Sequence, residues 1–377
     1  MQTEEEIHSH RLRTPAGFRA FRPLDHLLRR AKGRRLRWYA GAVAATLLVL
    51  SGVGPPFALM FGSGDSTPHS VTRPVPLPLR AVLGTTIHIP SGAVDVAVGK
   101  DAIWVSGFGR MTRLDPSTNR VVATVKTPGT EDYSHVAVGL GAVWVTSDGG
   151  TLYRIDPNTN RVVATILVGG PIVGVATGGG YVWVTRPTEG IGELIPVDPA
   201  TNRVSGAPID AGPGPIAALY GFGALWVTNS SPSSVVRVDP STGTVSTMGF
   251  TGRLVAGYGS LWASSDDAVV RVDPETGRPT AALRVPRAQA VAAGQGRVWV
   301  LASAKSSSPA LFHPVKNTAA LWEIDPMNNR IVGKPLRLAA LQPLALAVGG
   351  RAVWVADYDS GTITRFDLVR CGRSSCS

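Results

Sequence analysis

The sequence predicts an all-β protein, a seven-bladed β-propeller of four-stranded blades that is preceded by one N-terminal transmembrane helix. Three observations lead to this fold class. A unit of about 40 residues recurs along the chain, its segments are short and rich in β-branched residues, and one long segment near the N-terminus carries no charge. The 377 residues include 43 glycines and 29 prolines, and only 17% are charged. This composition suits a chain with many tight turns.

A tryptophan marks each repeat and sets the register of the other positions. A glycine precedes every one of these tryptophans by five residues, and an aspartate follows each, as part of an Asp-Pro pair in the first six units. Each unit holds four short apolar segments between Gly, Asn or Asp-Pro turns, which is the pattern of one propeller blade. The seven tryptophans are Trp104, Trp144, Trp183, Trp226, Trp262, Trp299 and Trp354.

The two ends of the repeat array predict that the ring closes. The seventh unit stops before a fourth strand, while residues 85–90 (TTIHIP) come before the first unit and form an isolated strand pattern. Pairing this strand into the last blade would remove an open sheet edge. We therefore expect one propeller domain over residues 83–370.

The repeated polar residues are expected to build the blades. Four residues after each Asp of the first six units only Asn or Gly occurs, and these residues tolerate a left-handed backbone. Arginine stands two residues before the Asp in five units, where we expect it to form an ion pair with that Asp. The tryptophans are expected to act as wedges between blades. The five arginines are Arg113, Arg154, Arg237, Arg271 and Arg365.

The second repeat, GLGAVWVTSDGGTLYRIDPNTNRVVATI, resembles the YVTN-type (YncE-like) β-propeller repeats. It is similar, more distantly, to virginiamycin B lyase-like propellers. The resemblance covers about three quarters of the chain and implies the fold more than a function. Lyase-like propellers are expected to use a magnesium-assisted site with His and Glu in the channel. No matching set is found here, so no catalytic residue is carried over and no cofactor is expected.

The N-terminal region predicts a membrane anchor. Residues 1–37 hold ten Lys/Arg against four Asp/Glu, and no charged residue occurs from Trp38 to Gly64. The positive-inside bias places a basic tail (1–37) in the cytoplasm, a transmembrane helix at 38–61 and a Pro-rich linker at 62–82. The propeller would then be extracytoplasmic, on a single-pass protein of the cell membrane. A cleaved signal peptide and a twin-arginine signal are the alternatives.

The C-terminal tail, residues 371–377, contains the only two cysteines, Cys371 and Cys376. They stand either as two thiols or as a small disulfide. No cysteine and histidine spacing typical of a metal site occurs, and we expect no bound metal.

Candidate binding residues are those at which the blades differ. The position nine residues before each Trp begins the inner strand. It is Gly or Ala in four units and polar only at Asp95, His135 and Arg253. We expect these three to form a polar channel mouth that binds a ligand. The loops between second and third strands should open on the same face and add Arg110, Asp148, Arg186, Asn229, Asp266, Lys305, His313 and Tyr358. Lys305 and His313 belong to a long insertion in the sixth unit, which is either a tolerated disordered insertion or a lid or partner contact.

These features favour a ligand-binding or scaffolding module over an enzyme, since the motifs of hydrolases, zinc proteases and phosphate loops are absent. The partner would be a protein, a glycan or a small molecule. One alternative is a lyase-like enzyme with a metal near Asp95 and His135. A second is a nucleic-acid-binding propeller, against which the nearly balanced charge of residues 38–377 argues.

Overall fold

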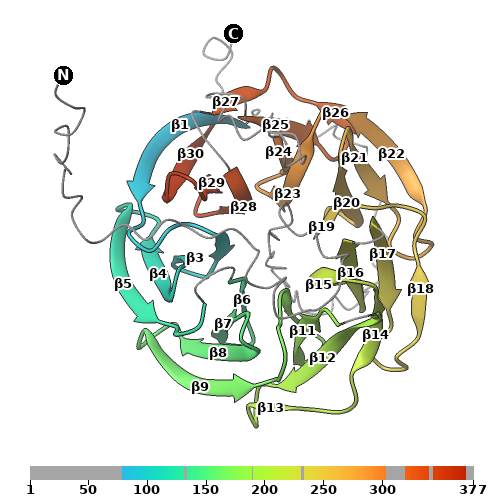
Figure 1. Ribbon diagram of the computed structural model, residues 1–377. Helices are drawn as coiled ribbons and strands as arrows, with labels where there is room; N and C mark the ends of the chain where they lie inside the picture. The colour runs from blue at the N-terminus through green and yellow to red at the C-terminus, as the bar shows by residue number, and fades with distance from the viewer. Residues whose placement is uncertain are drawn as a thin grey trace, which may run out of the picture. The chain divides into compact units, whose positions relative to one another are not determined.

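Seven antiparallel sheets surround a common axis in the computed structural model of the chain (Figure 1). The structure describes residues 79–130, 134–188, 190–230, 233–302, 319–338 and 343–370. The predicted cytoplasmic tail, transmembrane helix, most of the linker and the cysteine tail lie outside these residues. Within the described ranges no helix has the length and apolar character needed to cross a bilayer.

Each blade runs outward from the axis in sequence order. Blades 1 and 2 consist of β2 (Asp95–Val98), β3 (Ile103–Gly107), β4 (Arg110–Asp115) and β5 (Arg120–Lys126), then β6 (Val136–Gly139), β7 (Ala142–Thr146), β8 (Thr151–Asp156) and β9 (Arg161–Leu167). Blade 3 contains β10 (Val175–Gly178), β11 (Tyr181–Arg186), β12 (Gly192–Asp198), and the short β13 (Arg203–Val204) and β14 (Ile209–Gly212), both paired with β12.

The remaining blades follow the same order. Blade 4 contains β15 (Pro215–Gly221), β16 (Ala224–Ser230), β17 (Ser233–Val238) and β18 (Val245–Thr247), and blade 5 contains β19 (Arg253–Gly257), β20 (Ser260–Ser265), β21 (Ala268–Val272) and β22 (Pro279–Arg284). Blade 6 contains β23 (Ala288–Gly294), β24 (Arg297–Ala302), β25 (Ala319–Asp325), β26 (Arg330–Ile331) and β27 (Leu336–Leu338), and blade 7 contains β28 (Pro343–Gly349), β29 (Ala352–Asp357) and β30 (Thr362–Arg370).

The predicted closure of the ring is confirmed. Strand β1 (Leu79–His88) pairs antiparallel with β30 and supplies the fourth strand of blade 7, so the first and last strands of the propeller share one sheet. Strand β1 begins six residues before the expected pattern, and its register shifts between Leu83 and Thr86. Figure 1 shows β1 (blue) beside β30 (red).

Strand direction defines two faces of the ring. Within a blade the strands alternate in direction, so the turns after the first and third strands lie on one side, which we call the turn face. The loops after the second strand and the connections between blades lie on the other side, the loop face. Because β30 runs from the loop face to the turn face and β1 is antiparallel to it, the described chain begins on the turn face at Leu79.

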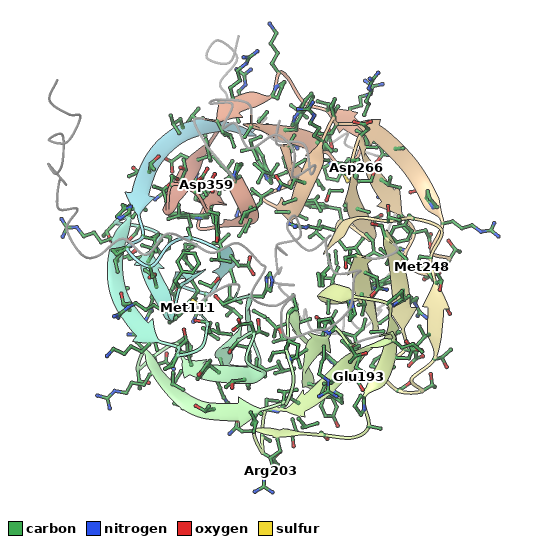
Figure 2. The ribbon with its side chains drawn as sticks, viewed as in Figure 1. Met111, Glu193, Arg203, Met248, Asp266 and Asp359 are labelled. Carbon is green, nitrogen blue, oxygen red and sulfur yellow. The ribbon has the colours of Figure 1, made fainter. Side chains whose placement is uncertain are left out.

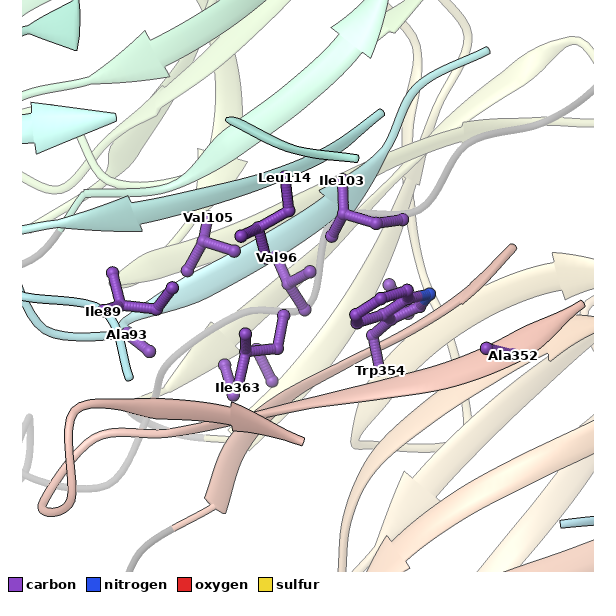
Figure 3. Close-up of a cluster of buried hydrophobic side chains, with 12 residues drawn as sticks. Ile89, Ala93, Val96, Ile103, Val105, Leu114, Ala352, Trp354 and Ile363 are labelled. Carbon is purple, nitrogen blue, oxygen red and sulfur yellow. The ribbon is translucent and has the colours of Figure 1, made fainter. Parts of the chain in front are cut away.

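The core consists of seven apolar clusters, each made by two adjacent blades. In the cluster between blades 7 and 1, Trp354 packs among Val96, Ile103 and Leu114 (Figure 3). All seven tryptophans are buried, which confirms their expected role as wedges. In blades 2 to 7 the indole N–H also donates to the carbonyl of the glycine five residues earlier, at 3.1–3.3 Å.

The recurrent glycine before each tryptophan allows neighbouring inner strands to approach closely. A Cβ at Gly349 would lie 2.3 Å from Val98 Cγ1 of blade 1, and a Cβ at Gly139 would lie 2.1 Å from Thr177 Oγ1 of blade 3. The glycine is therefore needed because of its small size, since the backbone here does not require positive φ.

The turns after the Asp-Pro pairs adopt the expected left-handed backbone. The φ angles are 60° at Asn119, 55° at Asn160, 56° at Asn202 and 50° at Asn329, and the glycines at the same place, Gly243 and Gly277, have φ of 70° and 66°. The Asp side chains accept hydrogen bonds from their own turns. The Ser117 hydroxyl and N–H lower the pKa of Asp115, and the Asn158 N–H lowers that of Asp156.

Of the five predicted Arg–Asp ion pairs, one is present as a direct contact among the described residues: Arg365 Nε lies 2.7 Å from Asp367 Oδ1. Arg113 instead reaches the turn of blade 2, where its Nη1 donates to Pro157 O and to Asn160 Oδ1, both at 2.8 Å. Its guanidinium also lies 5.6 Å from the Trp104 ring centroid.

This arginine clamp recurs at four of the seven junctions between blades. Arg154 binds Pro199 and Asn202, Arg271 binds Pro326 and Asn329, and Arg365 binds Pro116 and Asn119. Each clamp joins the third strand of one blade to the outer turn of the next, so the repeated Arg and Asn hold the ring together.

Candidate ligand-binding site at the loop-face end of the inner strands

Both kinds of loop predicted to share one face do so. In blades 1 and 4 the connection before the inner strand is hydrogen-bonded to the end of the second strand or the loop that follows it. Examples are Phe108 N to Ser91 O at 2.6 Å in blade 1 and Ser230 N to Gly214 O at 2.9 Å in blade 4. These bonds place both kinds of loop at the loop-face end of the inner strands.

Asp95 and His135 face each other at the loop-face ends of blades 1 and 2. Asp95 Oδ2 lies 3.4 Å from His135 Nδ1 and accepts the N–H of Val136 at 3.2 Å, while Oδ1 accepts the N–H of Val96 at 2.8 Å. Both side chains are buried. The sequence prediction that these two residues lie together is therefore confirmed, and the pair links the two inner strands.

Burial is the largest influence on the Asp95 carboxyl and raises its pKa, while the contact with His135 acts in the opposite direction. Arg253, the first residue of β19, is also desolvated, and burial lowers the pKa of its guanidinium to about 10 against a raising effect from Asp95. Arg253 remains charged at neutral pH. Its Nη1 donates to Leu344 O of blade 7 at 3.3 Å, so the side chain reaches from blade 5 toward blade 7.

A small pocket lies beside Arg253, between blades 4 and 5. Its lining includes Ala217, Thr228 and Leu254 in addition to Arg253. Ala217 and Thr228 have small side chains, which leaves a small space next to the guanidinium. Asp95, His135 and Arg253 supply an acid, an imidazole and a guanidinium at one end of the ring. In the described part of the chain, no three His, Cys, Asp or Glu side chains form a possible metal site.

Hydroxyl groups two residues after the tryptophans bridge the blades at this level. Ser106 Oγ accepts the N–H of Asp95 at 3.0 Å and donates to Ser134 O at 2.7 Å. Thr146 Oγ1 likewise accepts the N–H of His135 and donates to Val173 O. These bridges were not predicted, although Ser or Thr at this position in blades 1 to 5 was a visible signal.

The predicted loop residues occupy different surroundings. Arg110 and Asp266 are exposed, and Asp148 is half-buried in the turn between β7 and β8. Tyr358 packs edge-on against Phe108, with ring centroids 5.7 Å apart, in a small cluster with Val94 and Leu344. Lys305 and His313 lie outside the described residues.

Two of the predicted loop residues have structural contacts. Asn229 lies within β16 and is 2% exposed, with Nδ2 3.4 Å from Ser234 Oγ, so it is no surface loop residue. Arg186 Nε donates to Glu193 Oε2 at 2.6 Å, and its Nη1 donates to Gly169 O at 2.9 Å. Both were assigned to the loops because side-chain burial cannot be read from the repeat register.

Two exposed apolar side chains stand beside Arg186 on the loop face. Leu167, at the end of β9, is 77% exposed, and Ile191, in the loop before β12, is 61% exposed. Sequence reasoning missed both. The signal for Leu167 was its place at the end of an outer strand, where blades 1 and 5 have Lys126 and Arg284.

Comparisons with known proteins show the fold alone. No family model and no curated protein matches the sequence. The structure is similar to the hydrazine synthase of Kuenenia stuttgartiensis (13% identity, TM-score 0.56, covering 77% of this chain and 99% of that chain). It is also similar to a chain of the mitotic checkpoint complex (9% identity, TM-score 0.64, 83% and 98%). A third match is the extracellular domain of BT4673, described as a one-component system, from B. thetaiotaomicron (14% identity, TM-score 0.57, 77% and 42%).

These matches and the closed ring define the class of protein as a seven-bladed β-propeller. The resemblance to YVTN-type and lyase-like propellers stays a prediction.

Proposed function

We propose that this protein is a binding or scaffold module, a propeller anchored in the cell membrane whose loop face binds a ligand or protein partner outside the cytoplasm. The observation that carries the proposal is the contrast between the two classes of polar residue. The repeated arginines and asparagines are largely engaged in joining blades. The non-repeated Asp95, His135 and Arg253 gather at one end of the inner strands instead.

The chemistry of this end suits a ligand with an anionic group. The guanidinium of Arg253 lies in surroundings that desolvate it, where a bound carboxylate or phosphate would interact more strongly than in water. The exposed Leu167 and Ile191 near Arg186 offer a second, more apolar contact on the same face, as protein partners often require.

Three features support the membrane anchor and the extracytoplasmic location. The charge-free segment from Trp38 to Gly64 is long enough to span a bilayer, and arginines and a lysine precede it. The described chain begins on the turn face, so a tether that reaches Leu79 would leave the loop face free to meet a partner. One similar structure is an extracellular domain.

The location is tested in cells with a fusion partner at each end of the chain. An N-terminal tag should be protected from protease added outside, a C-terminal tag should be cleaved, and the chain should resist carbonate extraction from membranes. Release by carbonate, or protection of the C-terminal tag, would contradict the anchor or its orientation.

Binding is tested by thermal shift of the full chain in detergent against metals, glycans and cell-wall fragments. A true ligand should raise the melting temperature of the wild type and not that of Arg253→Gln. A matched control is Arg278→Gln, an exposed arginine on the turn face. An equal shift in all three chains would refute a site at Arg253.

The lyase-like enzyme is the second candidate, and the contact between Asp95 and His135 is the observation that favours it. Such a pair resembles a general acid and base. Turnover of a ligand found in the screen, lost in His135→Gln with binding retained, would support it. Binding without turnover would leave the binding module as the function.

A further inference from the structure

The turn face carries bulky apolar side chains at places where the backbone disfavours them. The turn between the first and second strands has a left-handed non-glycine residue in four blades: Leu140 in blade 2, Phe222 in blade 4, Tyr258 in blade 5 and Gln295 in blade 6, with φ of 52°, 54°, 53° and 56°. Tyr258 packs against the apolar cluster between blades 5 and 6. A bulky residue at positive φ is a conformational outlier. Blades 3 and 7 place Gly179 and Gly350 at the same position.

The side chains of Leu140 and Phe222 lie outside the apolar clusters of the core. Leu140 is 39% exposed and Phe222 is 45% exposed, although a glycine at the same place forms the same turn in blade 3. Between them, at the start of β11, Tyr181 is also exposed. Leu140, Tyr181 and Phe222 belong to three consecutive blades, and we call them the apolar arc. The left-handed backbone at Leu140 and Phe222 is strained, and a glycine would form the same turn without that strain. Keeping apolar side chains there points to a role at the surface.

Exposed arginines lie on the same face as the apolar arc. Four outer strands begin on the turn face with an exposed arginine, and Figure 2 shows Arg203 projecting outward from the rim. These are Arg120, Arg161, Arg203 and Arg330. None forms an ion pair with a residue in the described ranges. The aspartates of the adjacent turns accept hydrogen bonds from their own backbone and are half-buried, so they are less exposed than these arginines.

The described chain enters the propeller on this same face. Strand β1 starts on the turn face at Leu79, and residues 62–78 between it and the predicted helix span at most about 60 Å when fully extended. A bilayer surface within that reach meets the turn face at a high effective concentration, so a weak contact suffices. Aromatic residues with flanking arginines are the side chains preferred at the interface of a bilayer.

We propose that the turn face is a docking surface for the phospholipid membrane, with the apolar arc in the interface and the arginines at headgroup phosphates. This inference rests on the proposed anchor and adds to it a fixed orientation of the propeller. The loop face is then directed away from the bilayer, toward partners.

The test uses the full chain reconstituted in vesicles of phosphatidylethanolamine and phosphatidylglycerol, with Cys371→Ser and Cys376→Ser. A nitroxide is attached at Asn158→Cys on the turn face or at Asp266→Cys on the loop face, both exposed positions. We expect the label at 158 to collide several-fold less often with a water-soluble nickel complex than the label at 266. The difference should shrink in vesicles of phosphatidylcholine alone.

The variant Leu140→Asn with Phe222→Asn should abolish this protection while leaving the melting temperature unchanged or higher. Asparagine tolerates the left-handed backbone and offsets the lost contacts. Its matched control is Leu167→Asn, an exposed apolar residue on the loop face, which should change nothing at 158.

The outcomes separate this inference from the anchor. Resistance to carbonate with equal accessibility at both labels would overturn the docking surface and leave the anchor standing. Release of the protein from the membrane by carbonate would overturn both the docking surface and the anchor. Protection of the label at 158 in detergent that disappears on dilution would show that a second copy of the chain covers the face, and would also overturn the proposal.

Discussion

Replacing Asn160 by glycine isolates one arginine clamp. Glycine adopts the φ of 55° without strain, so the turn is kept and only the side-chain acceptor of Arg113 is removed. The bond from Arg113 Nη1 to Pro157 O remains. A hydrogen bond to a charged group contributes about 1.5–3 kcal/mol, and this one is half-buried, so we expect a loss of about 1.5 kcal/mol in unfolding free energy.

A double-mutant cycle with Arg113→Met measures the coupling directly. Methionine keeps an apolar stem over Trp104 and removes the donors. We expect a coupling energy of about 1 kcal/mol between positions 113 and 160 from urea unfolding of the full chain in detergent. Gly243→Asn is the matched control, because blade 3 has Pro196 in place of the clamp arginine and the site has open space. It should change stability little.

A coupling below about 0.3 kcal/mol, within the error of additivity, would refute the clamp as a stabilising interaction. The same result would mean that the apolar clusters and the other hydrogen bonds between blades hold them together without this contact.

Three further predictions follow from close contacts and charge. Gly349→Ala should destabilise the chain by about 2 kcal/mol, because its Cβ would lie 2.3 Å from Val98 Cγ1. Gly249→Ala is the control and should not destabilise it, because no atom lies within 4 Å of the added Cβ. Equal melting temperatures of the two variants would contradict the close-approach argument. The folded-state pKa of Asp95 is raised, so stability from this group is full below its unfolded value near 3.8 and is lost as pH rises through the folded pKa. Asp95→Asn should therefore gain stability relative to the wild type as pH rises above about 4, and parallel pH profiles would disprove this. Since the pKa of Arg253 is about 10, anion binding at this site should be constant from neutral pH to about 9 and weaken above 10, as calorimetric titration would show; a loss near pH 7 would assign binding to another group.

The repeat register predicted most of the fold. Seven blades, the closing strand and the left-handed Asn and Gly turns all depend on local patterns of strand, turn and spacing that each unit repeats. The start of β1 was placed too late, because residues 79–84 have no repeat partner to compare with and Pro-rich composition precedes them.

The candidate site was predicted only in part. Asp95 and His135 were found together because they occupy the same register position in consecutive blades. Asn229 and Arg186 were assigned to the loop surface, but the first is buried in β16 and the second binds Glu193 and Gly169. The exposed Leu167 and Ile191 were missed because an apolar residue near a strand end is expected in the core.

By itself the sequence determined the number of blades, their order, the way the ring closes and which residues bend each turn. These properties follow from contacts within one unit or from the unpaired ends of the array. The tertiary structure decided the partners of the repeated arginines, which reach into the next blade, and the glycines that allow inner strands to meet. It also decided which face each exposed side chain occupies. The contacts of these arginines and glycines join residues of different blades, and the arginine bonds span from 44 positions for Arg113 and Pro157 to 249 for Arg365 and Pro116. Their geometry exists only once the blades have assembled into the ring.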